Sequence, residues 1–297
     1  MSISSPVVSV VTPTYNRAGF LLQAIESVLQ QTFGDFELIV VDDGSTDDTP
    51  QLMDRYLQDT RVRYFKQSNQ GQSVARNRGI KEAQGEYICF LDSDNAWHED
   101  KLEKSLEAFR QNPGFHVVYG DYMVIDAEGN ELGVNQMRRY TGRVTAHLLK
   151  DNFVSMNTTM TRRNCFREMG GFDEKDRLAE DYGLWLRFST RYRFYYLDQI
   201  LGYYRVMNGQ ISSDKARRLE ANERLLKSFL AEYPDSVSAS EKRRGLSHFY
   251  ARKARHHGSS GEAIKALADS ARSLSLDPFW PAPWKALAKS FFRSRLR

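Results

Sequence analysis

Hydrophobic positions in the first hundred residues switch repeatedly between two periodicities. Short β-branched or apolar runs at residues 7–11, 36–41 and 87–91 are typical of buried strands, and residues 61–65 alternate as a strand does. Between residues 20 and 29 the apolar positions recur at helical spacing. Two more helices are expected, one starting near Pro50 and one from Ser73, its expected cap, to about Ala83. Strands and helices in turn imply right-handed crossovers and an α/β fold with a mostly parallel sheet flanked by helices.

The pattern changes twice further along the chain. Residues 100–214 are mixed, and after residue 215 strand signals nearly vanish. The mixed region predicts a helix at 101–110, a strand at 116–119, a hairpin around 127–130 and a helix starting near 181. The tail predicts helices broken near 233–235, 257–261 and 277–278. The sequence therefore predicts an α/β domain followed by a helical appendage.

Charge divides the chain in the same place. From Lys215 onward there are 18 Lys and Arg against 8 Asp and Glu, whereas the first 214 residues have 24 against 30. An acidic front argues against nucleic acid as the ligand. No apolar run approaches the ~20 residues of a spanning helix, the first residues lack a signal-peptide pattern, and only two cysteines are present. We therefore expect a cytoplasmic protein.

Polar residues follow directly after the first two predicted strands, at the edge where ligands of open parallel sheets bind. The loop Thr12-Pro-Thr-Tyr-Asn-Arg17 could hold a base or a ribose, and it is equally compatible with a simple turn. Asp42 and Asp43 place two carboxylates side by side, and a carboxylate can accept the imide N–H of uracil. The alternative is that these acids only cap the next helix, the favoured interpretation of Asp47 and Asp48.

The strand at residues 87–91 is followed by Asp92-Ser-Asp94, two carboxylates one residue apart. This pair suits Mg²⁺ or Mn²⁺, hard cations that keep several waters and take other ligands from substrate phosphates. An EF-hand is excluded, because its sixth position requires glycine and Trp97 stands there. The alternative is a pair of solvated loop acids.

Two further sets of side chains are candidates. No glycine-rich phosphate loop is present, so phosphate binding would rest on metal and on basic side chains such as Arg76 and Arg78. A solvated helix face is the alternative for these arginines. Glu180 and Asp181 open a predicted helix, where they could complement the helix dipole or supply a general base. Spacing alone favours the dipole interpretation.

Together and in this order, these residues resemble family 2 glycosyltransferases of the GT-A fold, over roughly residues 6–211. The matching stretches are Val8-Ser-Val-Val-Thr-Pro-Thr-Tyr-Asn-Arg17, Gln31-Thr-Phe33, Val41-Asp-Asp-Gly-Ser45, Ala75-Arg-Asn-Arg-Gly79, Gly85-Glu-Tyr-Ile88, Leu91-Asp-Ser-Asp94, Gly170-Gly-Phe-Asp173 and Glu180-Asp181. The resemblance implies a GT-A Rossmann-like domain over residues 1–214, with a donor-binding half at about 1–100 and an acceptor half at about 101–214. A basic helical region, 215–297, follows.

The resemblance also implies chemistry. The reaction would be inverting transfer from a nucleotide sugar, with UDP as the expected nucleotide, to a hydroxyl of a glycan or lipid-linked acceptor in bacterial surface glycan synthesis. The implied roles are Pro13 and Tyr15 lining the nucleotide pocket, Asp43 on the base with Arg76 nearby, Asp92 and Ser93 towards ribose and diphosphate, Asp94 on Mn²⁺ or Mg²⁺, and Asp181 as catalytic base.

The chain departs from the family pattern at one position. Many relatives have a Tyr-Arg-x-His stretch whose histidine helps to bind metal or diphosphate, and Met207 stands at that place here. Either the metal binds more weakly, or Arg205 serves the diphosphate instead. The Gln-x-x-Arg-Trp motif of processive synthases is missing, as are spanning helices, which favours transfer of a single sugar.

Alternatives of other classes stay open at this point. A nucleotidyltransferase acting on a sugar phosphate also uses a strand-end carboxylate pair, although it usually has a glycine-rich loop after the first strand. A non-catalytic binding module is the third interpretation. The basic helix near the end of the chain, with Trp284, Leu287 and Phe291 on one face, suits an anionic membrane surface as well as docking on the protein. Binding of this helix to an anionic membrane surface would place the protein at the inner face of the membrane.

Overall fold

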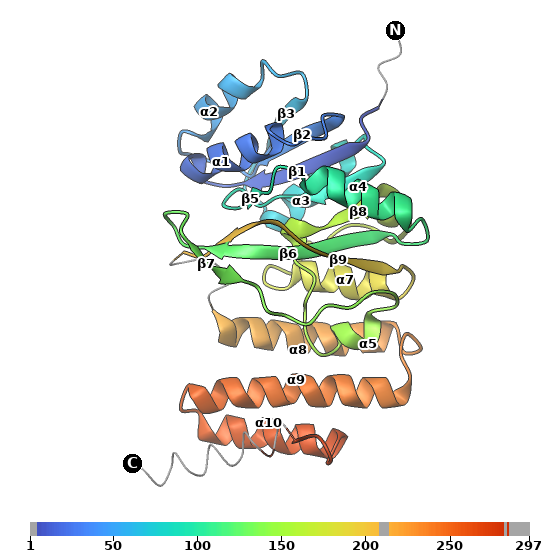
Figure 1. The fold of residues 1–297 in the computed structure, drawn as a ribbon. Helices are drawn as coiled ribbons and strands as arrows, with labels where there is room; N and C mark the ends of the chain where they lie inside the picture. Colours follow the sequence, from blue (N-terminus) through green and yellow to red (C-terminus); the bar gives the residue numbers. More distant parts are fainter. Residues whose placement is uncertain (1–4, 208–213, 282–283, 285–297) are drawn as a thin grey trace. The chain divides into compact units, whose positions relative to one another are not determined.

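The computed structural model describes residues 5–207, 214–281 and 284 (Figure 1). They pack as two units, of which the first comprises described residues of Met1–Arg143 and Phe153–Ser213. The second comprises Val144–Asn152 together with described residues of Asp214–Arg297. A short segment from the predicted acceptor half therefore packs with the helical tail.

The N-terminal part of the first unit is a parallel sheet with helical crossovers. Its strands β1 (Val8–Thr14), β2 (Phe36–Asp42), β3 (Val62–Lys66) and β4 (Tyr87–Phe90) lie in the order β3-β2-β1-β4, and each adjacent pair is parallel. The crossover helices are α1 (Ala18–Leu29), α2 (Thr49–Tyr56) and α3 (Gln72–Glu82). The predicted α/β fold, with a mostly parallel sheet flanked by helices, is confirmed.

The rest of the first unit extends this sheet across β8, in the order β4-β8-β6-β9-β5, with β7 paired to β6. The added strands are β5 (Ala96–Trp97), β6 (Val117–Ile125), β7 (Glu131–Val134), β8 (Met160–Arg162) and β9 (Phe194–Arg205). The helices are α4 (Lys101–Gln111), the 3-10 turn η1 (Met156–Thr158), α6 (Arg163–Met169) and α7 (Glu180–Ser189). The strand β8 is antiparallel to both β4 and β6, so it joins the donor and acceptor halves.

Close packing fixes α3 against the sheet. All seven residues of β1 and of β2 are buried, which explains their continuous apolar pattern. A Cβ atom at Gly79 of α3 would lie 2.2 Å from Cγ1 of Val11, so only glycine permits this approach. The expected cap at Ser73 is wrong, because α3 begins after Gly71 and the Ser73 hydroxyl donates to the Asp176 carbonyl instead.

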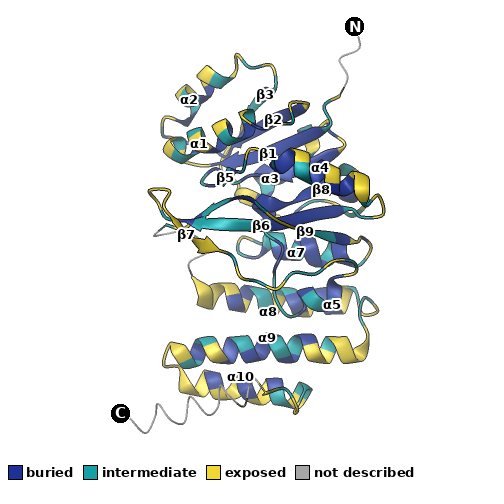
Figure 2. Ribbon diagram, viewed as in Figure 1, coloured by how far each residue is buried: buried dark blue, intermediate teal, exposed yellow. Residues whose placement is uncertain are grey.

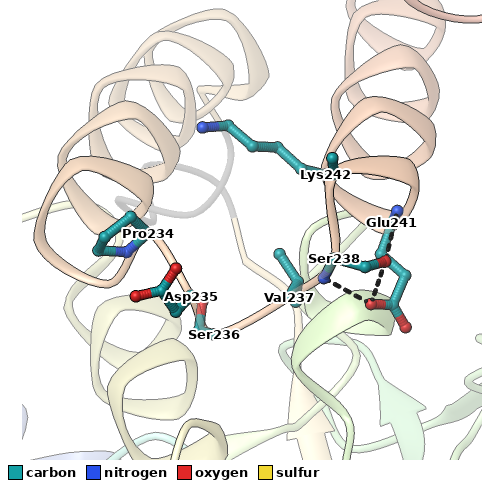
Figure 3. Close-up of a pocket in the computed structure, with 8 residues that line it drawn as sticks. Pro234, Asp235, Ser236, Val237, Ser238, Glu241 and Lys242 are labelled. Carbon is teal, nitrogen blue, oxygen red and sulfur yellow. Dashed lines mark hydrogen bonds between the residues drawn. The ribbon is translucent and has the colours of Figure 1, made fainter.

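The second unit is made of the helices α5 (Thr145–Leu148), α8 (Lys215–Glu232), α9 (Ala239–Ser259) and α10 (Ala263–Leu276). The helix ends agree with the predicted breaks. Between α8 and α9 the chain turns through Pro234, and Ser238 and Glu241 form a capping box at the start of α9 (Figure 3). Within the described residues, no helix is both long and apolar enough to cross a bilayer.

The last described helix turns its apolar face outward. The α10 residues buried against α9 are small or polar, and Ser247 and Ser273 exchange hydrogen bonds there (Figure 2). Ile264 and Leu267, in contrast, are 86% and 51% exposed. The helix therefore packs through polar contacts and presents hydrophobic side chains to solvent.

Candidate active site

The loops after β1 and β2 are tied together. Asn16 has a positive φ of 51°, its N–H donates to Ser45 Oγ (2.9 Å), and its Oδ1 accepts from Thr46 N (2.8 Å). Asp47 accepts from the N–H of Ala18 and from Thr49 at the start of α2, whereas Asp48, at the N-cap position, makes no capping hydrogen bond, so the predicted capping holds for Asp47 and is wrong for Asp48. The two strand-end loops thus form one rigid edge.

The residues predicted to hold the nucleotide lie along this edge. Pro13 is buried within β1, and Tyr15, just beyond the strand, is 48% exposed. Asp43 is buried, and its carboxylate accepts from Gln67 Nε2 (2.8 Å), Gln70 N (3.0 Å) and Gly71 N (2.7 Å). Asp43 therefore fixes the loop that leads into α3.

Asp42 has a purely structural environment. It is fully buried, and its carboxylate accepts from Ser45 N (2.7 Å) and from the Tyr64 hydroxyl (2.5 Å). Of the two adjacent carboxylates, Asp42 therefore holds the turn after β2, and Asp43 remains the candidate for the base.

Arg76 joins three elements. Its side chain is 2% exposed, and the guanidinium donates to Asp92 Oδ1 (2.6 Å) after β4 and to Glu180 Oε1 (2.8 Å) at the start of α7. Burial would lower the pKa of Arg76, but the two carboxylates outweigh burial and raise that pKa. The alternative that Arg76 lies on a solvated helix face is wrong.

The loop after β4 is held from two more sides. Asn157, in η1, accepts from Asp92 N (2.8 Å) and donates to Asp92 Oδ2 (3.0 Å). With Arg76 on Oδ1, both oxygens of the Asp92 carboxylate have partners. Ser93 is buried and Asp94 is half-buried in the turn that follows.

Arg205 supports this loop from behind. It is buried, and its guanidinium donates to the carbonyls of Asp94 (3.0 Å), Asp126 and Ala127 and to Gln23 Oε1 (2.6 Å). Because these contacts occupy its guanidinium, Arg205 holds the Asp94 turn. The alternative that Arg205 serves the diphosphate stays a prediction.

The Gly170-Gly171 loop is attached to α3 and leads to Asp181. Asn77 donates to the Phe172 carbonyl (3.0 Å) and accepts from Phe172 N (2.8 Å). A Cβ at Gly171 would lie 2.2 Å from Asn77 Oδ1, so this contact requires glycine. Asp181 is half-buried in the first turn of α7, next to Glu180. The structure therefore brings Arg76, Asp92 and Glu180 into one network, and the base candidate Asp181 follows Glu180 in the chain.

The sequence did not reveal two parts of this site. Asn157 and Asn77 orient the Asp92 and Gly171 loops, yet a single asparagine in a sequence has no distinctive pattern. Arg205 was a candidate for the diphosphate, and its contact with the Asp94 turn was not predicted. Only the neighbouring Arg76 and the Gly-Gly pair hinted that residues 75–79 contact other loops. Among described residues, no group of three or more His, Cys, Asp or Glu side chains could hold a metal ion.

Comparison with known proteins supports one family. The model of glycosyl transferase family 2 matches residues 9–170, more than half of the chain. The chain belongs to this family. An uncharacterized glycosyltransferase of Rickettsia felis is 37% identical over 202 residues, 68% of this chain, and the matched part is 33% of that protein. This chain thus spans about a third of the length of that relative.

Two other relatives agree with the assignment. A Bacillus subtilis glycosyltransferase named for teichuronic acid biosynthesis, TuaG, is 33% identical over 214 residues, 71% of this chain and 83% of that protein. The crystal structure of S. aureus TarS 1–349 with UDP-GlcNAc matches with a TM-score of 0.70 at 21% identity, over 95% of this glycosyltransferase and 88% of that chain. At that identity the structural match shows the GT-A fold alone. The predicted family and fold class are confirmed.

Proposed function

We propose that this glycosyltransferase moves a single sugar from a UDP-sugar to a hydroxyl of a glycan or lipid-linked acceptor, with inversion at the anomeric carbon. The observation that carries this proposal is the buried Arg76 bridge. It joins the Asp92 loop to Glu180, the neighbour of Asp181. The base candidate is thereby attached to the loop that we expect to meet the donor.

Asp181 is the proposed general base. A helix N-terminus stabilises negative charge, so the first turn of α7 suits a carboxylate that must be ionised to accept a proton. Asp181 takes the proton of the acceptor hydroxyl, whose oxygen bonds to the anomeric carbon while the bond from that carbon to the diphosphate oxygen breaks. Because attack comes from the face opposite the diphosphate, the configuration inverts without a covalent enzyme intermediate.

The nucleotide would lie along the edge formed by the loops after β1 and β2. Tyr15 offers an exposed ring for the base, beside the buried Pro13. A carboxylate has about four acceptor positions, and Asp43 uses three of them on the loop before α3. The fourth is enough to accept the imide N–H of uracil.

Asp94 is the residue we propose for Mn²⁺ or Mg²⁺. Both oxygens of Asp92 are engaged, and Met207 replaces the histidine of many relatives, so the donor set is small. Such a set fits a cation that takes most of its ligands from water and phosphate. When bound, the cation would neutralise charge on the departing diphosphate, which Ser93 would also approach.

The proposed acceptor is a bacterial surface glycan, and the proposed location is the inner face of the membrane. The relation to TuaG favours a bacterial surface glycan. Membrane contact through the C-terminal region is supported by the exposed apolar side chains Ile264, Phe279 (93%) and Trp284 (55%) in a strongly basic tail. The remaining residues of the predicted basic helix, 285–297, lie outside the described residues. The cytoplasmic location stays a prediction.

A donor screen tests the function. UDP-sugars and other nucleotide sugars are offered with Mn²⁺ or Mg²⁺ and with glycan or lipid-linked acceptors, and the released nucleotide is measured. We expect release of UDP that depends on the acceptor and on the metal. Release of pyrophosphate from a nucleoside triphosphate and a sugar phosphate would support the nucleotidyltransferase alternative instead.

Truncation tests the membrane contact. Removing residues 279–297 should reduce binding to anionic liposomes and leave activity on a water-soluble acceptor intact. Unchanged liposome binding would contradict the membrane proposal without affecting the proposed reaction.

A further inference from the structure

A basic groove lies within the helical unit, between the first two turns of α8 and the last two turns of α9. Its volume is about 450 Å³, and it is lined by Lys215, Arg218 and Asn222 from α8 and by Arg252, Arg255 and His256 from α9, among others. On α8 the residues are three and four positions apart, and on α9 Arg255 and His256 lie three and four positions after Arg252, so each set forms a single helical face. The groove belongs to none of the motifs assigned above.

The two helices are held at a fixed separation beside the groove. Glu223 of α8 accepts hydrogen bonds from Tyr250 (3.1 Å) and Lys253 of α9. The charges of Glu223 and Lys253 offset each other within this contact. The contact therefore determines the width of the groove without contributing net charge to it.

The charges of the groove itself are balanced only in part, since Arg218 and Arg252 both interact with Asp151. Four of its lining residues are Lys or Arg, His256 is a fifth basic side chain, and none of the described residues that line it is acidic. Arg252 pairs with Asp151 and donates to the Lys150 carbonyl (2.9 Å), which anchors its guanidinium at the wall. The nearby Asp214 caps α8 by accepting from Arg217 N. Lys215 and Arg255 are exposed, so the groove retains positive charge.

This arrangement suits an oxyanion, and a phosphate group carries more negative charge than a carboxylate. Guanidinium groups present paired N–H donors that match phosphate oxygens, and an ammonium adds a point charge. The N-terminus of α8 and the C-terminus of α9 meet at this end, so their partial charges offset each other and the basic side chains supply the positive charge. The volume lies in the range of small-ligand sites, about 300–1,000 Å³, and accommodates a diphosphate with an attached group.

We propose that the α8–α9 groove is a second anion site that binds a phosphate or diphosphate group, separate from the donor site and independent of metal. The proposal does not rest on the proposed reaction, because it involves none of the residues assigned to donor, metal or proton transfer. Phosphate and diphosphate groups occur on soluble glycan intermediates and on lipid headgroups, and both sources present the same chemistry to the groove.

Binding of inorganic pyrophosphate to the full chain tests the proposal. The titration is followed by calorimetry at physiological salt with EDTA, so that no metal bridges pyrophosphate to Asp94. The variant Lys215→Gln/Arg255→Gln removes two groove charges, and Arg224→Gln/Arg243→Gln removes two exposed charges from the same helices outside the groove. All four side chains are exposed, so both variants should keep the fold, which circular dichroism checks.

We expect wild type and the Arg224/Arg243 variant to bind alike and the groove variant to bind at least ten-fold more weakly. Equal affinity of the two variants, or no saturable binding by wild type, would overturn the proposal. Sedimentation with phosphatidylcholine vesicles, with and without phosphatidylglycerol, then identifies the source. Loss of phosphatidylglycerol-dependent sedimentation only in the groove variant indicates a lipid headgroup, whereas a change in pyrophosphate affinity alone indicates a soluble phosphate ligand.

Discussion

Arg76 shows how one buried side chain connects the donor and base regions. A guanidinium is the most suitable cation for this position, because its planar fork donates to two carboxylates at once. Asp92 and Glu180 come from elements more than eighty residues apart in the chain, and Arg76 contacts both. We infer that Arg76 is a positioning residue for Asp181 and for the loop that carries Asp94.

Replacing Arg76 with methionine should lower both stability and activity. Two partly buried carboxylates would lose their charged partner. Losing both ion pairs should lower the free energy of unfolding by about 2–3 kcal/mol, somewhat less than breaking a fully buried network. That loss corresponds to a fall in Tm of roughly 5–10 °C for a chain of this size. Thermal melts and steady-state kinetics provide the measurements.

The control for this change is Arg78→Met. Arg78 donates to the Lys66 carbonyl near the surface and contacts neither carboxylate, so its loss should matter little. Arg76→Lys keeps the charge but not the fork, and kcat should fall further than Tm. If Arg76→Met left kcat unchanged while lowering Tm, Arg76 would be structural only.

The helix α3 positions most of the site at the scale of elements. Asp43 holds its N-terminal end through Gly71 N, Gly79 sets its distance from β1, and Asn77 attaches the loop that leads to α7. The short stretches that match family 2 glycosyltransferases therefore reflect the packing of α3 as well as the chemistry of the site.

Gly79→Ala tests this packing. The added methyl would lie 2.2 Å from Cγ1 of Val11, so helix and strand must separate, at a cost of about 1–3 kcal/mol. Urea denaturation should show a lower midpoint with an unchanged slope. Gly34→Ala is the control, because nothing lies within 4 Å of its Cβ, and its midpoint should stay the same or rise slightly. Equal midpoints for the two variants would contradict the packing argument.

The contact between α8 and α9 should make the helical unit sensitive to acid. Burial raises the pKa of Glu223, but hydrogen bonds from Lys227 and Lys253 outweigh burial and lower that pKa from 4.5 to about 2. A folded-state pKa below the unfolded one stabilises the fold above pH 4.5, and this contribution disappears as the pH falls towards 2.

The urea midpoint of wild type should therefore decrease as the pH falls from 7 to 3, and protonation of Glu223 should account for part of this decrease. The variant Glu223→Gln should be less stable at neutral pH and depend less on pH over the acidic part of the range. A Glu223→Gln variant with the same pH dependence as wild type would show that this carboxylate is not responsible.

Much of the element pattern could be predicted from sequence. The strands β1, β2 and β4 are buried along their whole length and α1 has apolar positions at helical spacing, so the alternation of β1 to β4 with α1 to α3 was predicted, and so were the breaks between the tail helices. The short strands β5 and β8 contain two and three residues, too few to show a period. The site contacts of Asn157 and Arg205 depend on tertiary structure and could not be predicted.

At the scale of the whole molecule, charge and chemistry divide between two units. The first unit holds the candidate donor, metal and base residues on an acidic front, whereas the second concentrates positive charge on helices. Each unit thus suits a different part of the account, since we propose sugar transfer for the first and anion binding for the second.

The most direct test of the account compares turnover with UDP binding in Asp181→Asn. The amide is isosteric and can still accept from Tyr182 N, so the fold and the nucleotide pocket should be retained. We predict that UDP binds as in wild type and that sugar transfer falls by about 10²–10⁴-fold, the usual contribution of a general base. The control Asp54→Asn, exposed on α2, should behave as wild type. Transfer by Asp181→Asn at the wild-type rate would contradict the account.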